Sequence, residues 1–143
     1  MRNARRMLLI GAAIVAASCS TVAPVKITAG DQCIRCRRTI QDTLMAGELV
    51  YKGGLVEKFR APGCMAKYLA TYPATNADAF VTDFKSGKFV KAREAVYVPV
   101  LVDPNTGTTD YRAYKLRADA DAAARDLRAR PLEWDVVLQK ARG

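Results

Sequence analysis

No histidine occurs among the 143 residues of this chain. Ser/His/Asp triads and Cys/His pairs use an imidazole as the base, so these classes of nucleophilic enzyme are excluded. Zinc and copper sites that rely on imidazole are excluded too, and any transition metal must be held by cysteine, methionine or oxygen. The sequence also lacks a glycine-rich phosphate loop, because Gly53-Gly54 is not followed by a helical pattern, and no pair of carboxylates indicates acid–base catalysis. We therefore expect a protein that is not an enzyme.

Acidic residues are scarce: Asp and Glu number 14 against 23 Lys and Arg, which gives a net charge of +9. Half of the residues are apolar and the mean hydropathy is −0.06, so the composition is that of a globular chain rather than a disordered or polytopic membrane protein. The basic residues are scattered and are not interleaved with aromatic residues. This pattern argues against nucleic acid as a partner.

The first 18 residues have the features of an export signal. Three arginines lie within residues 1–6, and the apolar run Met7–Val15 is too short to span a bilayer, which needs about 20 residues. Ala16-Ala17-Ser18-Cys19 resembles the lipobox of bacterial lipoproteins, in which the cysteine takes acyl chains such as palmitate and becomes the first residue of the mature protein. A plain secretory signal cut after Ala23 and a retained anchor helix are the alternatives.

Lipidation of Cys19 would tether the domain to a membrane of the cell envelope, on the periplasmic or extracytoplasmic side. Removal of residues 1–18 takes away three arginines and no acid, so the mature chain would have 20 basic and 14 acidic residues and a net charge of +6. That charge favours an anionic membrane surface. Outside the cytoplasm, thiols oxidise unless they are protected or bound to metal.

Residues 19–30 contain one proline and no helical periodicity, so we expect a short tether before the domain. After it, two β-type runs flank Gly53-Gly54, a pair typical of a tight hairpin. The apolar residues of 64–72 recur on one face of a helix that ends before Pro73. Pro99 lies within an apolar strand and indicates an edge position or a bulge. The expected elements are strands 48–51, 55–59, 79–84, 88–92, 95–102 and 110–116 and helices 64–72 and 118–130.

The order strand, strand, helix, strand occurs about twice, over residues 40–100 and 88–143. We therefore predict an α+β fold made of two small ββαβ-type units, at residues 31–87 and 88–143. Neither unit is large enough to bury a core of its own, so we expect the two to pack together. The segment around residues 132–138 has no clear pattern.

With Cys19 acylated, three thiols remain: Cys33, Cys36 and Cys64. The spacing of Cys33-Ile-Arg-Cys36 lets both sulfurs point to one centre, as in metal knuckles, or close into a small disulfide, as in redox loops. Cys64 stands at the start of the predicted helix, where the helix dipole and free N–H groups favour a thiolate. Three thiols cannot all pair within one chain.

Soft sulfur ligands favour Cu(I), zinc and iron–sulfur clusters. Structural zinc and iron–sulfur sites usually need four protein ligands, whereas Cu(I) suits two or three sulfurs. The candidate ligands are therefore Cys33, Cys36 and Cys64, with the thioether of Met65 as a fourth candidate. Arginines 35, 37 and 38 would lower thiol pKa values and offset the negative charge of a metal–thiolate centre. Two alternatives stay open: a redox or structural Cys33–Cys36 disulfide without metal, and cysteines with no function.

The chain resembles the NosL family of lipoproteins, which are associated with copper delivery to nitrous oxide reductase. The resemblance covers most of the sequence after the export signal. It is carried, in this order, by Cys19, Asp31-Gln-Cys33-Ile-Arg-Cys36, Phe59-Arg-Ala-Pro-Gly-Cys64-Met-Ala-Lys-Tyr-Leu69, Phe80–Gly87, Ala95–Val98 and Tyr111–Tyr114.

This resemblance implies two related ββαβ units, Cu(I) held by cysteine and methionine, and a copper-accepting enzyme or transporter as partner. Two positions differ from the family. Its first cysteine motif usually continues into Gly-Met, where this chain has Arg37-Arg38, and the methionine often found in the second unit's hairpin is missing from Asp103–Thr109. Copper would then depend on Cys33, Cys36 and Cys64 or Met65. A branch that kept the fold and changed the cargo is the alternative.

Overall fold

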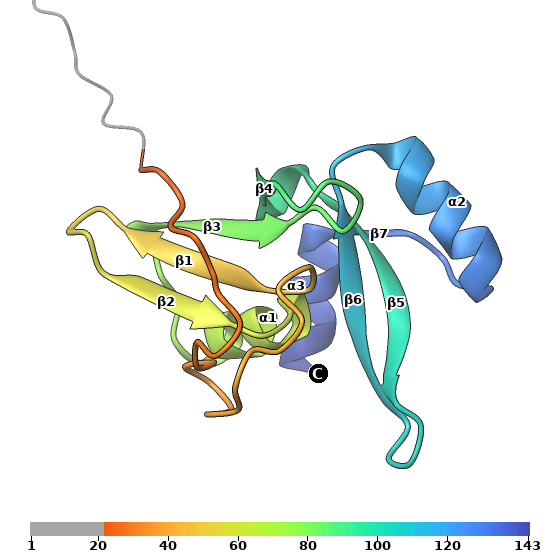
Figure 1. Ribbon diagram of the computed structural model, residues 1–143, viewed down its shortest axis with the longest axis horizontal. Coiled ribbons are helices and arrows are strands. Elements are labelled where there is room, and N and C mark those ends of the chain that lie inside the picture. Colours follow the sequence, from red (N-terminus) through yellow and green to blue (C-terminus); the bar gives the residue numbers. More distant parts are fainter. Residues whose placement is uncertain (1–21) are drawn as a thin grey trace, which may run out of the picture.

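The computed structural model describes residues 22–143 as an α+β fold, as the sequence predicts, with two antiparallel sheets and three α-helices in this part of the chain (Figure 1). The predicted signal of residues 1–18 and the predicted lipidation site Cys19 lie outside the described residues. The strands are β1 Gly47–Tyr51, β2 Val56–Phe59, β3 Ala77–Thr82, β4 Phe89–Lys91, β5 Val96–Asp103, β6 Thr108–Tyr114 and β7 Leu132–Glu133. The helices are α1 Pro62–Thr71, α2 Arg117–Leu127 and α3 Trp134–Arg142, with a short 3-10 helix at Ala92–Glu94.

The first sheet has the strand order β2-β1-β3-β4. The predicted hairpin joins β1 to β2 through Lys52–Leu55, and Gly54 takes a φ of +92°, a conformation that glycine adopts without steric cost. Helix α1 starts with Pro62, whose fixed φ suits the first helical position, and ends before Pro73, as predicted. The helix packs against this sheet and places its first turn beside the end of β2.

The second sheet has the order β6-β5-β7 and is covered by α2. Strand β5 is central in this order, yet β7 pairs only with Val96 and Tyr97, so Pro99 has β6 as its only neighbouring strand. A bulge follows between Leu101 and Asp103. The missing N–H of Pro99 is therefore tolerated, for the reason that the sequence indicates.

The boundary between the two units differs from the predicted division at residues 87 and 88. Strand β4 pairs with β3, through Val90 opposite Val81, and so extends the first sheet. The repeated order strand, strand, helix, strand is then β1-β2-α1-β3 followed by β5-β6-α2-β7, with β4 as an addition to the first unit. A three-residue strand looks the same in sequence wherever its partner lies, because pairing is a long-range property.

The two units share one core, as predicted. Leu49, Phe59 and Met65 of the first unit belong to the same buried cluster as Tyr97 and Trp134 of the second. The previously unassigned end of the chain forms β7 and α3, and α3 lies against α1 across the junction (Figure 1). Packing between the units thus fixes where α1 sits relative to β6.

Residues 25–30 of the predicted tether lie against the domain. Ile27 is buried in a small cluster with Ile40 and Ala46, and the Val25 N–H donates to a carboxylate oxygen of Glu48. These contacts hold residues 25–30 on the domain. None of the helices in residues 22–143 is long and apolar enough to cross a membrane.

Candidate metal centre

The CxxC motif lies in a tight loop that is fixed by backbone hydrogen bonds. The Arg37 N–H donates to the Cys33 carbonyl at 2.9 Å, and the Cys33 N–H donates to the Arg38 carbonyl at 3.0 Å. The loop is attached to β2 because the Ile34 N–H donates to the Lys58 carbonyl at 2.9 Å. Arg37 has a φ of +60°, a left-handed conformation that favours glycine. The hydrogen bond from Arg37 to Cys33 closes the turn that contains both cysteines.

Cys64 reaches the same place from α1. It is the third residue of α1, and α1 follows β2 in the chain. The CxxC loop is hydrogen-bonded to the same strand, so the loop and the start of α1 lie side by side. The sulfurs of Cys33, Cys36 and Cys64 all lie within 4.8 Å of one another. We call these residues the cysteine trio. The sequence predicts all three as ligands, and the fold brings all three together.

The trio is buried on one side and open on the other. Cys33 is fully buried and Cys64 is 5% exposed, whereas Cys36 is half-buried. Access from the cavity is therefore to Cys36 and Cys64.

The thiols of Cys33 and Cys64 are joined by a hydrogen bond. A hydrogen bond from Cys64, helped by the backbone N–H groups of Cys36 and Arg60, lowers the pKa of Cys33 to about 4 against the opposing effect of burial. The same hydrogen bond and burial raise the pKa of Cys64. The sequence predicts a thiolate at Cys64 from its place at the helix start. Two touching thiols do not both ionise, and the N–H donors around Cys33 favour the thiolate there.

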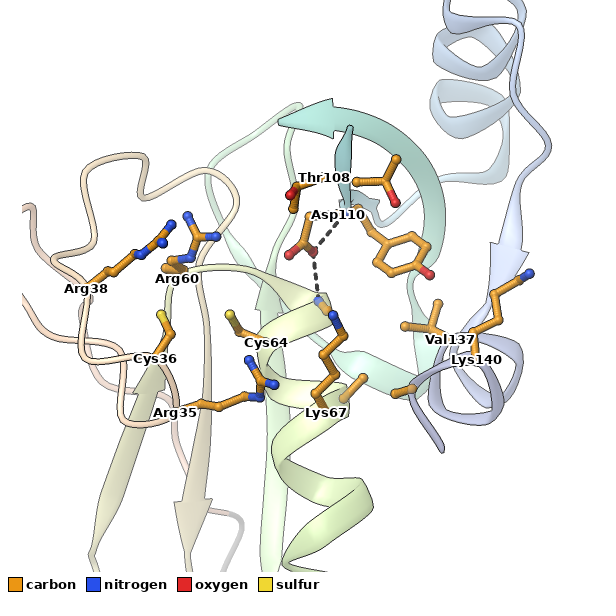
Figure 2. Close-up of a pocket in the computed structure, with 15 residues that line it drawn as sticks. Arg35, Cys36, Arg38, Arg60, Cys64, Lys67, Thr108, Asp110, Val137 and Lys140 are labelled. Carbon is orange, nitrogen blue, oxygen red and sulfur yellow. Dashed lines mark hydrogen bonds between the residues drawn. The ribbon is translucent and has the colours of Figure 1, made fainter. Parts of the chain in front are cut away.

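A cavity of about 500 Å³ opens over Cys36 and Cys64, between the CxxC loop, α1, β6 and α3. Figure 2 shows the two sulfurs inside it, with Arg38 and Arg60 on one side and Arg35 on the other. Its charged lining residues are Arg35, Arg38, Arg60, Lys67, Lys140 and Asp110. We call this space the basic pocket. Only the arginines of the CxxC segment were visible as a charged group in the sequence.

Asp110 lies at the site, although the sequence does not reveal it. Its carboxylate comes from β6 of the second unit and accepts the Gly63 N–H of α1 at 2.8 Å and its neighbour Tyr111 N–H at 2.8 Å. Helix α1 has no capping side chain of its own at Ala61, so Asp110 does what an N-cap residue would do. Burial raises the pKa of Asp110 despite these hydrogen bonds.

Met65, the fourth predicted ligand, points elsewhere. It is fully buried in the core, and its terminal methyl group lies 3.4 Å from the place that a Cβ on Gly47 would occupy. It does not line the basic pocket. Neighbouring residues of a helix point about 100° apart, which sends Cys64 to the pocket and Met65 to the sheet.

Three sulfurs at this spacing suit a three-coordinate soft ion. With metal–sulfur bonds of about 2.3 Å, a planar site places its sulfurs about 4 Å apart. The trio reaches that geometry by small side-chain rotations, since its sulfurs already lie within 4.8 Å. Structural zinc normally takes four protein ligands, and the group found in residues 22–143 offers three.

The fold is that of a known structure. The crystal structure of the copper chaperone NosL from Shewanella denitrificans matches this chain with a TM-score of 0.64 at 17% sequence identity, over 80% of this chain and 95% of that chain. The chain therefore has a NosL-like fold. No family model and no curated protein sequence matches it.

Proposed function

We propose that this protein binds Cu(I) at the cysteine trio and delivers it to an extracytoplasmic copper enzyme, such as nitrous oxide reductase. The observation that carries the proposal is the convergence of Cys33, Cys36 and Cys64 within 4.8 Å at the edge of an open cavity. The NosL-like fold supports it, because the matched protein is a copper chaperone. A sulfur-only site without imidazole favours Cu(I) over the harder divalent ions.

Transfer requires no bond-breaking catalysis. A ligand of the acceptor approaches from the side of Cys36, and each new bond from the acceptor to copper replaces one bond to a cysteine sulfur. The ion remains Cu(I) throughout, and the released thiolates take up protons. The protein supplies a site in which the sulfurs are already close, so little ordering is needed when copper binds.

The location of the protein is part of the proposal. The sequence of residues 1–19 supports an exported lipoprotein that is held at the membrane through acylated Cys19. Labelling with a radioactive fatty acid tests this, and Cys19→Ala is expected to abolish both the label and recovery of the protein with membranes. Unchanged labelling of the Cys19→Ala chain would contradict lipidation at this residue.

Anaerobic titration of the reduced chain with Cu(I), against a chromophoric chelator, tests the copper site. We expect one tightly bound Cu(I) per chain and protection of the trio thiols from alkylation. The variant Cys33→Ser with Cys36→Ser is expected to lose tight binding, because a hydroxyl is a poor ligand for a soft ion. Binding by this variant as tight as that of the parent would refute the proposal.

A thiol–disulfide module on the same fold is the second candidate. The lowered pKa of Cys33 and its contact with Cys64 favour it, since reactive thiols have these features. It predicts a reversible disulfide between two of the three cysteines and redox activity without metal. Two measurements separate the candidates. Mass spectrometry of the air-exposed chain shows whether a disulfide forms, and titration after reduction shows whether the chain binds Cu(I). A chain that forms the disulfide in air and, once reduced, does not bind Cu(I) supports the redox module.

A further inference from the structure

The basic pocket contains more positive charge than the copper site needs. Five cationic side chains line it, from Arg35, Arg38, Arg60, Lys67 and Lys140. None of the five makes an ion pair among the described residues 22–143, where the ion pairs involve other basic residues. In addition, Nε of Arg60 is buried without a hydrogen-bond partner. The Arg60 guanidinium group donates a hydrogen bond to the Cys64 sulfur, and its remaining N–H groups, together with the other four cations, are available to a ligand.

The negative charges in and near the pocket do not balance them. Asp110 lines the pocket, and Asp103 on the β5–β6 hairpin interacts electrostatically with Arg38. A Cu(I) ion held by three thiolates has a net charge of −2. Together with Asp103 and Asp110, at most four negative charges therefore face the five cations. Without copper the negative charge is smaller still. A positive surplus remains in both states, inside a cavity that concentrates its field.

The chemistry of the surplus indicates carboxylates. Arg35 and Arg60 have planar guanidinium groups, which bind carboxylate groups through two parallel hydrogen bonds. Lys67 of α1 and Lys140 of α3 lie on the other side of Cys64 from Arg38 and Arg60 (Figure 2). An anion held between these two groups would lie beside Cys64 (Figure 2). The volume of about 500 Å³ suits a small molecule rather than a folded protein surface.

We propose that the basic pocket binds a small thiol with two carboxylates and that Cu(I) reaches the cysteine trio as the complex of such a thiol. This inference rests on the proposed function, because it names the form in which the copper arrives. In each exchange one Cu–S bond to the small thiol breaks and one Cu–Sγ bond forms. An incoming Cys36 or Cys64 thiol gives its proton to the released thiolate. When the Cys33 thiolate is the incoming ligand, the released thiolate takes its proton from water, and copper stays Cu(I) throughout.

The first test contains no copper. S-methylglutathione, which has two carboxylates and no free thiol, is titrated into the reduced, metal-free full chain by calorimetry. We expect saturable binding that weakens at least tenfold when both carboxylates of the probe are esterified. The paired variant Arg35→Gln with Lys140→Gln is expected to weaken binding at least tenfold, because it removes one cation from each side of the pocket. The matched control is Lys88→Gln with Arg125→Gln, two exposed cations away from the pocket, which should leave the dissociation constant within twofold.

The second test adds copper. Loading from Cu(I)–glutathione is expected to be at least tenfold faster than loading from the Cu(I) complex of the esterified thiol, and to lose this advantage in Arg35→Gln with Lys140→Gln. The pocket proposal is overturned if the probe does not bind, if its ester binds as well, or if the control pair weakens binding equally. Failure of the copper site appears separately, as loss of Cu(I) affinity in the titration against a chelator, since the calorimetric test uses no metal and a probe without a free thiol.

Discussion

Cys64 and Met65 are adjacent in the chain but lie in different environments. Cys64 borders the basic pocket, whereas Met65 packs in the core against β1. We expect Met65→Leu to change Cu(I) affinity less than threefold, because leucine fills a similar volume and the thioether is not in the pocket. Competition with a chromophoric Cu(I) chelator measures this. Cys36→Ser is the positive control, with an expected loss of at least a hundredfold; an equal loss in Met65→Leu would make Met65 a ligand.

Glu48 is a buried carboxylate that does not line the basic pocket. It is fully buried on β1, with one oxygen accepting the Val25 N–H and Oε2 without a partner. Burial raises its pKa above the ordinary value. The folded chain therefore holds a proton at Glu48 that the unfolded chain releases above a pH of about 4.5, and the free energy of unfolding falls as the pH rises through this window.

Glu48→Gln tests this assignment. We expect the variant to be more stable than the parent at pH 8 by about 1 kcal/mol, and the difference to vanish near pH 4, because the buried charge is removed. Urea denaturation followed by circular dichroism at several pH values measures the difference. A stability gain that is the same at pH 4 and pH 8 would show that Glu48 is not the titrating group.

At the scale of the element, the start of α1 depends on a close approach that only glycine allows. A Cβ on Gly63 would lie 2.8 Å from Oδ1 of Asp110, which accepts the Gly63 N–H. We expect Gly63→Ala to lower the free energy of unfolding by about 1–3 kcal/mol, because the carboxylate must move and a buried hydrogen bond is lost. Gly53→Ala is the matched control, since its Cβ would meet nothing within 4 Å, and should change stability by less than about 0.5 kcal/mol.

Urea denaturation of both glycine variants measures these effects. Cu(I) affinity of Gly63→Ala, measured alongside, reports whether the position of Cys64 depends on Asp110. Equal stability of the two variants would show that the approach of β6 to α1 contributes nothing.

The elements that could be predicted were those with a turn or a helix-end signal in their own sequence. The β1–β2 hairpin has its Gly53-Gly54 turn, and α1 has proline at its start and just past its end. Strand β4 was given to the wrong unit, and α3 was not assigned at all. Both are short, and what fixes them is contact with distant residues: Val81 for β4 and the α1 face for α3. Short segments without a local turn or cap signal do not reveal such partners.

At the scale of the whole molecule, the shared core should make the two units unfold together. Trp134 stacks on Tyr97 with ring centroids 5.2 Å apart and belongs to the cluster that both units line. We expect Trp134→Ala to lower the free energy of unfolding by about 3–5 kcal/mol and to keep a single transition. Circular dichroism follows the secondary structure of both units, the alkylation rate of Cys36 follows the first unit alone, and the two midpoints should coincide. Separate midpoints would show that each unit has a core of its own.

The sequence by itself determined the chemistry of this protein: the absence of histidine, the presence of a CxxC and a third cysteine, and the α+β pattern all follow from residue types and short-range spacing. Only the tertiary structure decided that Cys64 joins Cys33 and Cys36, that Met65 turns into the core, and that Asp110, Lys67 and Lys140 surround the sulfurs. The reason is that the basic pocket is built from the CxxC loop, α1, β6 and α3. These segments meet because the two units bury one core between them, and the positions of long-range neighbours are set by that packing rather than by any local pattern.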